Sequence, residues 1–92
     1  MDISYDPAKD ARNVARRGLS FARAADFGWA DADIMEDVRF PYPERRFVAV
    51  GYLDGRLHVL CFTPTDGGVR IISFCKANTR EANRYGKAQT ID

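Results

Sequence analysis

The stretch that decides the fold is "RFVAVGYLDGRLHVLCFT", residues 46–63. Two runs rich in β-branched and aromatic residues flank Asp54-Gly55, the strongest short-range signal for a two-residue hairpin turn. Such a turn also fixes the register of the two strands, because it sets the residues that flank it opposite each other. The predicted pairs are Leu53–Arg56, Tyr52–Leu57, Val50–Val59 and Val48–Cys61.

A third strand is predicted in "VRIISFC", residues 69–75, after a looser turn over residues 64–68. That turn predicts the pairs Cys61–Ile71, Val59–Ser73 and Leu57–Cys75. Because side chains alternate along a strand, the sheet has two faces. The face with the bulky aromatic residues should carry the helices, and it holds Phe47, Ala49, Gly51, His58, Leu60, Phe62, Arg70, Ile72 and Phe74. The other face keeps polar groups near its ends, at Arg46, Tyr52, Ser73 and position 75.

Capping signals predict helices at both ends of the chain. In "DPAKDARNVARRG", residues 6–18, Asp6 can cap a helix that Gly18 ends. Ser20 can cap a second, short helix that ends near Phe27 or Gly28. "NTREANRYG", residues 78–86, predicts a final helix, because Asn78 and Glu81 have the spacing of a capping box.

Two weaker strands complete the prediction. "DISY", residues 2–5, suits an opening strand, and Ile34, Met35 and Val38 could form an edge strand in the acidic stretch 31–44. Residues 1–92 are therefore predicted to be a single α+β domain, in which an antiparallel meander is packed by two N-terminal helices and a C-terminal helix. No apolar run is long enough to span a membrane. The polar opening does not resemble a signal peptide, so we expect a cytoplasmic protein with reduced cysteines.

The net charge of +1 hides an uneven distribution. Residues 26–44 carry a net charge of −5, whereas residues 1–25 carry +2 and residues 70–92 carry +3. Basic ends around an acidic middle could form a polyanion site, and the alternative is a mixed, solvated surface. The acidic stretch could likewise contact a basic partner or remain a solvated loop.

Cys75 and His58 are the residues whose chemistry stands out first. Cys75 could be a nucleophile, a metal ligand, half of a disulfide or an inert thiol. The only histidine, His58, is predicted on the opposite face, so a Cys-His pair and a zinc site are both disfavoured. Cys61 is predicted four residues away along the face, too far for a disulfide. His58 could act as a general acid or base, or be a packed strand histidine.

The final helix carries residue types that could bind a nucleic acid or serve only the structure. Arg80 and Arg84 are four residues apart, Glu81 and Tyr85 follow on a neighbouring stripe, and Lys76 precedes the helix. Cations, a tyrosine and a carboxylate can bind phosphates, stack a base and move a proton. The structural alternative is equally concrete: Glu81 serves the capping box, Arg84 is solvated and Tyr85 packs on the sheet.

Three motifs resemble the BrnT toxins. "YDPAKDARNVARRGLSFARA" is similar to the opening pattern D-P-x-K, an asparagine, a basic pair or K-H-G, and S-F-x-x-A. "RFVAVGYLDGRLHVLCFTP" is similar to the R-x-x-x-x-G hairpin, and "VRIISFCKANTREANRY" to the closing R-I-I-S motif with its glutamate and tyrosine. The motifs run in order from Tyr5 to Tyr85.

The resemblance implies a RelE-like fold and a type II toxin. It implies an endoribonuclease that arrests translation without a metal or other cofactor. It also implies a BrnA-type antitoxin partner that reaches operator DNA through its own DNA-binding domain, and it leaves open a homodimer within that complex. No contact with a membrane is implied.

The candidate site residues follow from the resemblance together with the chemistry of the final helix, and the match itself does not settle which of them are catalytic. The candidates for binding and cleaving the phosphate, or for moving a proton, are Arg17, Arg46, Lys76, Arg80, Glu81 and Tyr85, together with position 75. Further RNA contacts are expected at Lys9 and Arg70, which match the motifs, and at Arg84 of the final helix. Arg17 stands where the family often has histidine, and Cys75 stands where the pattern has arginine. We therefore hypothesise an attenuated nuclease, with a non-catalytic domain that binds the antitoxin and co-regulates transcription as the alternative.

Overall fold

The fold is built on the predicted hairpin, in a computed structural model that describes residues 1–91. Asp92, which counts in the charge of the C-terminal region, lies outside the described residues. Strands β3 (Arg46–Leu53) and β4 (Arg56–Thr65) meet at a turn in which Asp54 and Gly55 both have positive φ, 51° and 73°. These angles are typical of the type I′ turn that suits the twist of a hairpin. All four predicted pairs of β3 and β4 are confirmed.

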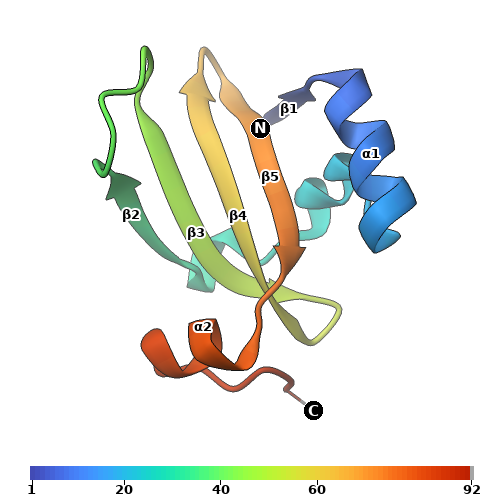
Figure 1. The fold of residues 1–92 in the computed structure, drawn as a ribbon, viewed down its shortest axis with the longest axis vertical. Coiled ribbons are helices and arrows are strands. Elements are labelled where there is room, and N and C mark those ends of the chain that lie inside the picture. The colour runs from blue at the N-terminus through green and yellow to red at the C-terminus, as the bar shows by residue number, and fades with distance from the viewer. Residues whose placement is uncertain (92) are drawn as a thin grey trace.

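Five strands form one sheet in the order β1-β5-β4-β3-β2 (Figure 1). Strand β5 (Gly68–Lys76) and edge strand β2 (Asp33–Asp37) extend the hairpin into the predicted antiparallel meander. Strand β1 (Asp2–Tyr5) pairs in parallel with the first half of β5, so the sheet is mixed rather than wholly antiparallel. The α+β class is confirmed.

The predicted register of β4 and β5 is wrong. Strand β4 continues through Pro64, the turn is at Asp66-Gly67, and Cys61 pairs with Ser73 rather than Ile71. Pro64 lies beyond the end of the β3–β4 ladder, where β4 is an edge on that side and tolerates a proline. A bulge between Cys61 and Phe62 then moves Ile71 to the face that holds Phe62.

The two faces of the sheet differ in what covers them. The inner face, defined by Ala49, His58, Leu60, Phe62 and Phe74, packs against 3₁₀ segments η1 (Phe21–Asp26) and η2 (Trp29–Asp31). Ser20 caps η1 as predicted, although the segment is 3₁₀ rather than a regular α-helix. Most of the hydrophobic core lies in this layer.

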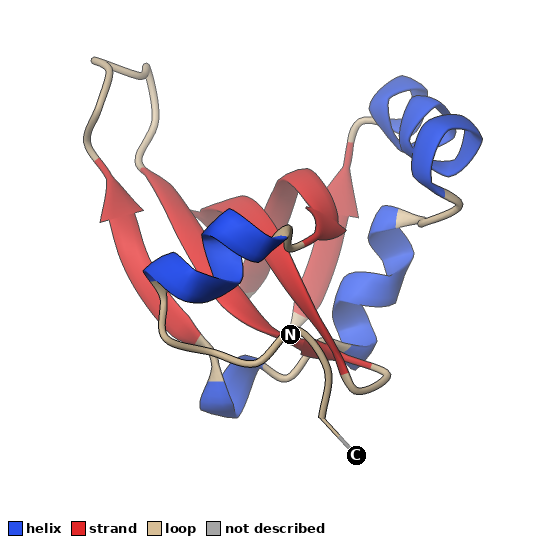
Figure 2. Ribbon diagram, turned by 60° about the horizontal axis from the view of Figure 1, so that its bottom comes forward, coloured by secondary structure: helices blue, strands red, loops and turns tan. Residues whose placement is uncertain are grey.

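The C-terminal helix lies on the opposite, outer face, contrary to the prediction that one face carries all the helices. Helix α2 (Thr79–Arg84) has the predicted capping box and buries Ala82 against Val50 and Leu57 (Figure 2). The Ala77 amide donates to the Leu57 carbonyl at 2.9 Å, which directs the chain across this face as it leaves β5. Only one end of the outer face is covered, and Ser73 remains exposed.

Helix α1 (Pro7–Arg17) stands beside the sheet and buries none of its residues (Figure 1). Its caps are as predicted: Asp6 accepts from the Ala8 amide, and Gly18 has a φ of 65°. Two polar side chains hold it. Asn13 donates to the carbonyls of Leu19 and Phe74, both at 2.9 Å, and Asp10 accepts from the Phe21 amide at 2.7 Å. None of the helices in residues 1–91 is long and apolar enough to cross a membrane.

Candidate functional site

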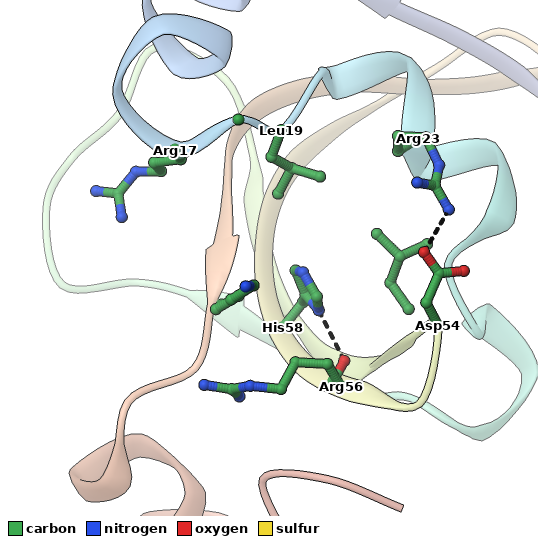
Figure 3. Close-up of a pocket in the computed structure, with 9 residues that line it drawn as sticks. Arg17, Leu19, Arg23, Asp54, Arg56 and His58 are labelled. Atoms are coloured by element: carbon green, nitrogen blue, oxygen red, sulfur yellow. Dashed lines mark hydrogen bonds and ion pairs between the residues drawn. The ribbon is translucent and has the colours of Figure 1, made fainter.

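A cavity of about 650 Å³ opens on the inner face where β5 leaves the sheet (Figure 3). The end of α1, segment η1, the β3–β4 turn and the last residue of β5 all contribute to it. Its polar lining consists of Arg17, Arg23, Asp54, Arg56, His58 and Lys76, and Leu19 and Leu53 form an apolar wall. We call this the inner-face cavity.

His58 lies at the base of the cavity. It is opposite Lys76 in the β4–β5 register, is 3% exposed, and its ring lies 5.4 Å from the Phe74 ring. Its Nδ1 is 2.7 Å from the Arg56 carbonyl oxygen, which can only accept, so Nδ1 carries the proton in the neutral ring. Burial, aided by the charges of Arg56 and Lys76, lowers the pKa of His58 and favours this neutral form.

The cations around His58 fall into two groups. Arg23 is neutralised by Asp54 and Asp26 at 2.8 and 3.2 Å. Arg56 donates to the carbonyls of three residues of the surrounding backbone, Leu57, Ala77 and Gln89. Within residues 1–91, the side chains of Arg17 and Lys76 form neither a hydrogen bond nor an ion pair. They are therefore the cations available to an anion in the cavity.

A second, shallower groove runs between α1 and β5. Its cationic lining consists of Lys9, Arg12, Arg16 and Arg17, and its other walls include Asn13, Ile72 and Ser73. No acidic side chain lines this groove in the described part of the chain. We call it the basic groove, and Arg17 joins it to the inner-face cavity because it lines both.

Position 75 lies on the outer face, on the other side of β5 from His58, so the predicted separation of the two residues is confirmed. Burial raises the pKa of the Cys75 thiol, although the charge of Arg17 partly opposes this effect. The thiol is therefore protonated at neutral pH. Cys61 is two residues away diagonally rather than four, and both cysteines are free.

The structure brings only some of the predicted site residues together. Arg17 and Lys76 line the inner-face cavity, Lys9 lines the basic groove, and the charges of Arg17 and Glu81 reach Cys75. Arg46 is at the far end of β3, on the order of 23 Å from Leu53. There it pairs with Glu44 at 3.0 Å and stacks on Tyr42 at 4.1 Å. Arg70 is exposed near the same end, opposite Thr63.

The candidates on α2 divide between structure and surface. Glu81 accepts from the Asn78 amide at 3.0 Å in the capping box, and Tyr85 packs beside the Val50–Leu57 cluster. Arg80 and Arg84 are exposed, and the Arg84 guanidinium lies 5.8 Å from the centre of the Tyr85 ring. The structural roles suggested for Glu81 and Tyr85 are therefore present.

Sequence reasoning missed Arg12, Arg16, Arg56 and Asn13 as parts of these sites. Three of them could have been found, because Lys9, Arg12, Asn13 and Arg16 follow the spacing of one helix face. Arg56 carries no such signal, since its partners come from distant parts of the chain. Within residues 1–91 no group of three or more His, Cys, Asp or Glu side chains is arranged to hold a metal ion.

Replacing Asn13 with alanine should destabilise the protein by about 1–3 kcal/mol, because two carbonyls lose their donor. It should also loosen α1 and weaken any anion binding that depends on Arg17. Urea unfolding measures the first effect and RNA binding at fixed salt measures the second. Asn83→Ala, on the exposed side of α2, is the control. Equal stabilities for the two variants would contradict the role of Asn13.

Comparisons with known proteins point to one family. The family model described as "Ribonuclease toxin, BrnT, of type II toxin-antitoxin system" matches residues 5–81. The crystal structure of the Brucella abortus ribonuclease toxin BrnT is 26% identical, with a TM-score of 0.65, over 86% of this chain and 99% of that one. No curated protein matches the chain. The family match spans most of the sequence, and the chain belongs to the BrnT family of ribonuclease toxins of type II toxin–antitoxin systems.

Proposed function

We propose that this chain is a metal-independent endoribonuclease with a RelE-like fold that arrests translation by cutting RNA. The observation that carries the proposal is the cationic surface that runs from the basic groove to the inner-face cavity, with Arg17 in both. Lys9 and Arg17 are eight residues apart on α1, which spans about 12 Å. Such a row of cations suits consecutive phosphates of one RNA strand.

We expect the role of each cationic residue in RNA cleavage to depend on its position. Lys9, Arg12 and Arg16 bind backbone phosphates, while Arg17 and Lys76 stabilise the charge that develops on the phosphate being cleaved. Arg46, Arg70, Arg80 and Arg84 lie farther away and would contact flanking RNA. Glu81 and Tyr85 act mainly through the position and packing of α2 rather than by proton transfer.

The proposed partner is a BrnA-type antitoxin that contacts operator DNA with a domain of its own. The complex would act in the cytoplasm, and this chain could form a homodimer within it. The acidic stretch 31–44 could bind a basic segment of the antitoxin through Asp33 and Glu36 of β2, which would exchange their present partners Lys87 and Arg45 for it. The Asp37 side chain is 6% exposed and stays paired with Arg39. Pull-down with an Asp33→Lys variant would test this contact.

A second candidate function is that of a non-catalytic domain that binds the antitoxin, and Cys75 favours it. An arginine lost from this position could leave a protein that binds the antitoxin and tunes transcription without cutting RNA. Purified protein, with and without Cys75→Arg, separates the two functions. RNA cleavage by either form supports the nuclease, whereas no cleavage by both, together with tight binding of the antitoxin, supports the non-catalytic domain.

Replacing Arg17 with alanine is expected to slow RNA cleavage by roughly tenfold to 100-fold, because charge-assisted hydrogen bonds to a phosphate are lost. The rate constant with a labelled RNA, at one salt concentration, measures the effect. Arg39→Ala is the matched control, since Arg39 is an exposed arginine in the loop after β2, paired with Asp37 at 2.8 Å. A similar loss in both variants would mean that total charge, rather than the place of Arg17, determines the rate.

A further inference from the structure

We propose that His58 is the general base of the reaction and that the phosphate to be cleaved binds between Arg17 and Lys76 in the inner-face cavity. The inference rests on the proposed ribonuclease function and names the centre of its site. It assigns a role to a buried histidine that would otherwise be read as a packed strand residue.

The first argument is the free nitrogen of His58. Nδ1 is engaged with the Arg56 carbonyl at 2.7 Å, so the neutral ring leaves Nε2 with its lone pair. Nε2 has no hydrogen-bond partner in residues 1–91. Within residues 1–91, Thr63 Oγ1 is the polar side-chain atom that is both fully buried and without a hydrogen-bond partner. Because Nε2 also has no partner but is not fully buried, it remains accessible from the cavity that His58 lines. Figure 3 shows the second ring nitrogen on the side of the ring away from Arg56.

The second argument is the placement of charge. Lys76 is directly opposite His58 across the β4–β5 ladder, on the same face. Arg17 lines the rim of the cavity at the end of α1, and Figure 3 shows its side chain directed away from His58, so its guanidinium must turn inward to reach a bound phosphate. The other charged groups around the ring are Arg56, held by backbone carbonyls, and the Arg23–Asp54 pair. An anion in the cavity therefore meets Lys76 next to a proton acceptor and Arg17, likewise unengaged, at the rim, while the carboxylate in the lining is already neutralised.

The third argument is that one histidine is enough to account for every proton that is transferred during cleavage. Nε2 takes the proton of a ribose 2′-hydroxyl, and the 2′ oxygen attacks the adjacent phosphorus as the bond from phosphorus to the 5′ oxygen breaks. The leaving 5′ oxygen takes a proton from water, and the imidazolium returns its proton to the hydroxide that remains. The products are a 2′,3′-cyclic phosphate and a 5′-hydroxyl. Arg17 and Lys76 stabilise the extra negative charge on the phosphate during this step.

The decisive variant is His58→Asn. The Asn amide nitrogen can replace Nδ1 as the donor to the Arg56 carbonyl, whereas nothing replaces Nε2. We expect kcat to fall roughly 10²- to 10⁴-fold, the usual contribution of a general base, with the protein still folded by circular dichroism. His58→Gln, which places its amide nearer to the Nε2 position, should also be inactive because an amide is not a base.

The pH dependence distinguishes a base from a structural residue. Cleavage by the parent should rise with pH through the pKa of His58, which burial sets below its usual value, and then level off. In His58→Asn this limb of the profile should be absent. If the residual cleavage by His58→Asn still rose with pH in the same range, another group would be responsible for the pH dependence, and His58 would not be the base.

Binding can be tested without cleavage, because His58 is the only histidine and gives a single set of imidazole NMR signals. An RNA oligonucleotide with 2′-O-methyl groups cannot be cut by 2′-hydroxyl attack. Its addition should shift the His58 signals and raise the pKa of the ring, since a phosphate nearby favours imidazolium. Arg17→Ala should weaken the shift, and unchanged signals at saturating RNA would overturn the cavity as the phosphate site.

The outcomes separate this inference from the proposed function. Activity should be measured in the chain as it stands and in Cys75→Arg. If either form cleaves RNA and His58→Asn in the same background cleaves equally fast, the base role alone fails. If neither form cleaves RNA, the nuclease function and the base role fail together.

Discussion

Replacing Cys75 with arginine is expected to raise the rate of RNA cleavage by about tenfold, because a guanidinium at the edge of β5 adds one charge-assisted contact to the RNA beside the cavity rather than a donor to the phosphate being cleaved. The thiol at this position offers nothing in its place. It is half-buried, and burial raises its pKa, so it is neither charged nor nucleophilic at neutral pH. Growth arrest on induction should increase in parallel with the rate.

The location of position 75 explains why an arginine there would matter. The residue is the second-last of β5, immediately before Lys76, and the charge of Arg17 already reaches its side chain. Its neighbour on the outer face, Ser73, is exposed and lines the basic groove, so there is room for a longer side chain. A guanidinium at this point would add a third cation at the edge of β5, close to the path proposed for RNA.

Two variants control for other effects of this change. Cys75→Ser removes the thiol without adding charge and should leave the rate unchanged. Thr65→Arg adds the same charge at the exposed far end of β4 and should raise cleavage little, since screening weakens charges at a distance. Equal rates for the parent and Cys75→Arg would show that this position does not limit the enzyme.

The parts of the fold that sequence predicted are those set by neighbouring residues. Asp54-Gly55 fixes its own turn geometry and hence the register of β3 and β4, and the caps of α1 and α2 depend on residues within one turn. The bulge at Cys61–Phe62 was missed, because it reflects how β4 and β5 pack across the core rather than any local signal. The side on which α2 lies is likewise set by the Ala77–Leu57 bond between distant residues.

The candidate site shows the same division. Arg17 and Lys76 were identified by the motifs around them, but their meeting at one cavity depends on Asn13, whose partner Phe74 is 61 residues away. Arg46 was grouped with them on sequence grounds, and the length of β3 separates it from the cavity. The local pattern predicted the kinds of residue, and only the tertiary contacts decide which of them share a site.

Replacing Phe74 with alanine is expected to destabilise the protein by about 3–5 kcal/mol, the usual cost of removing a buried phenylalanine ring. Phe74 is 1% exposed, and its ring packs edge-on against Phe27 at 5.9 Å. In a domain of this length, each kcal/mol lost from the free energy of unfolding lowers the melting temperature by roughly 4–8 °C. Urea unfolding with a constant m-value measures the change.

Two variants place this result in relation to function. Phe40→Ala removes the same ring from a side chain that is 62% exposed and should change stability by less than about 0.5 kcal/mol. Phe74→Leu keeps most of the volume and should fold, but it takes away the ring that lies 5.4 Å from His58. If the Leu variant is stable and its cleavage rate falls, Phe74 also positions the imidazole. If Phe74→Ala were as stable as the parent, Phe74 would not be central to the core, because removing a well-packed ring leaves a cavity that lowers the free energy of unfolding.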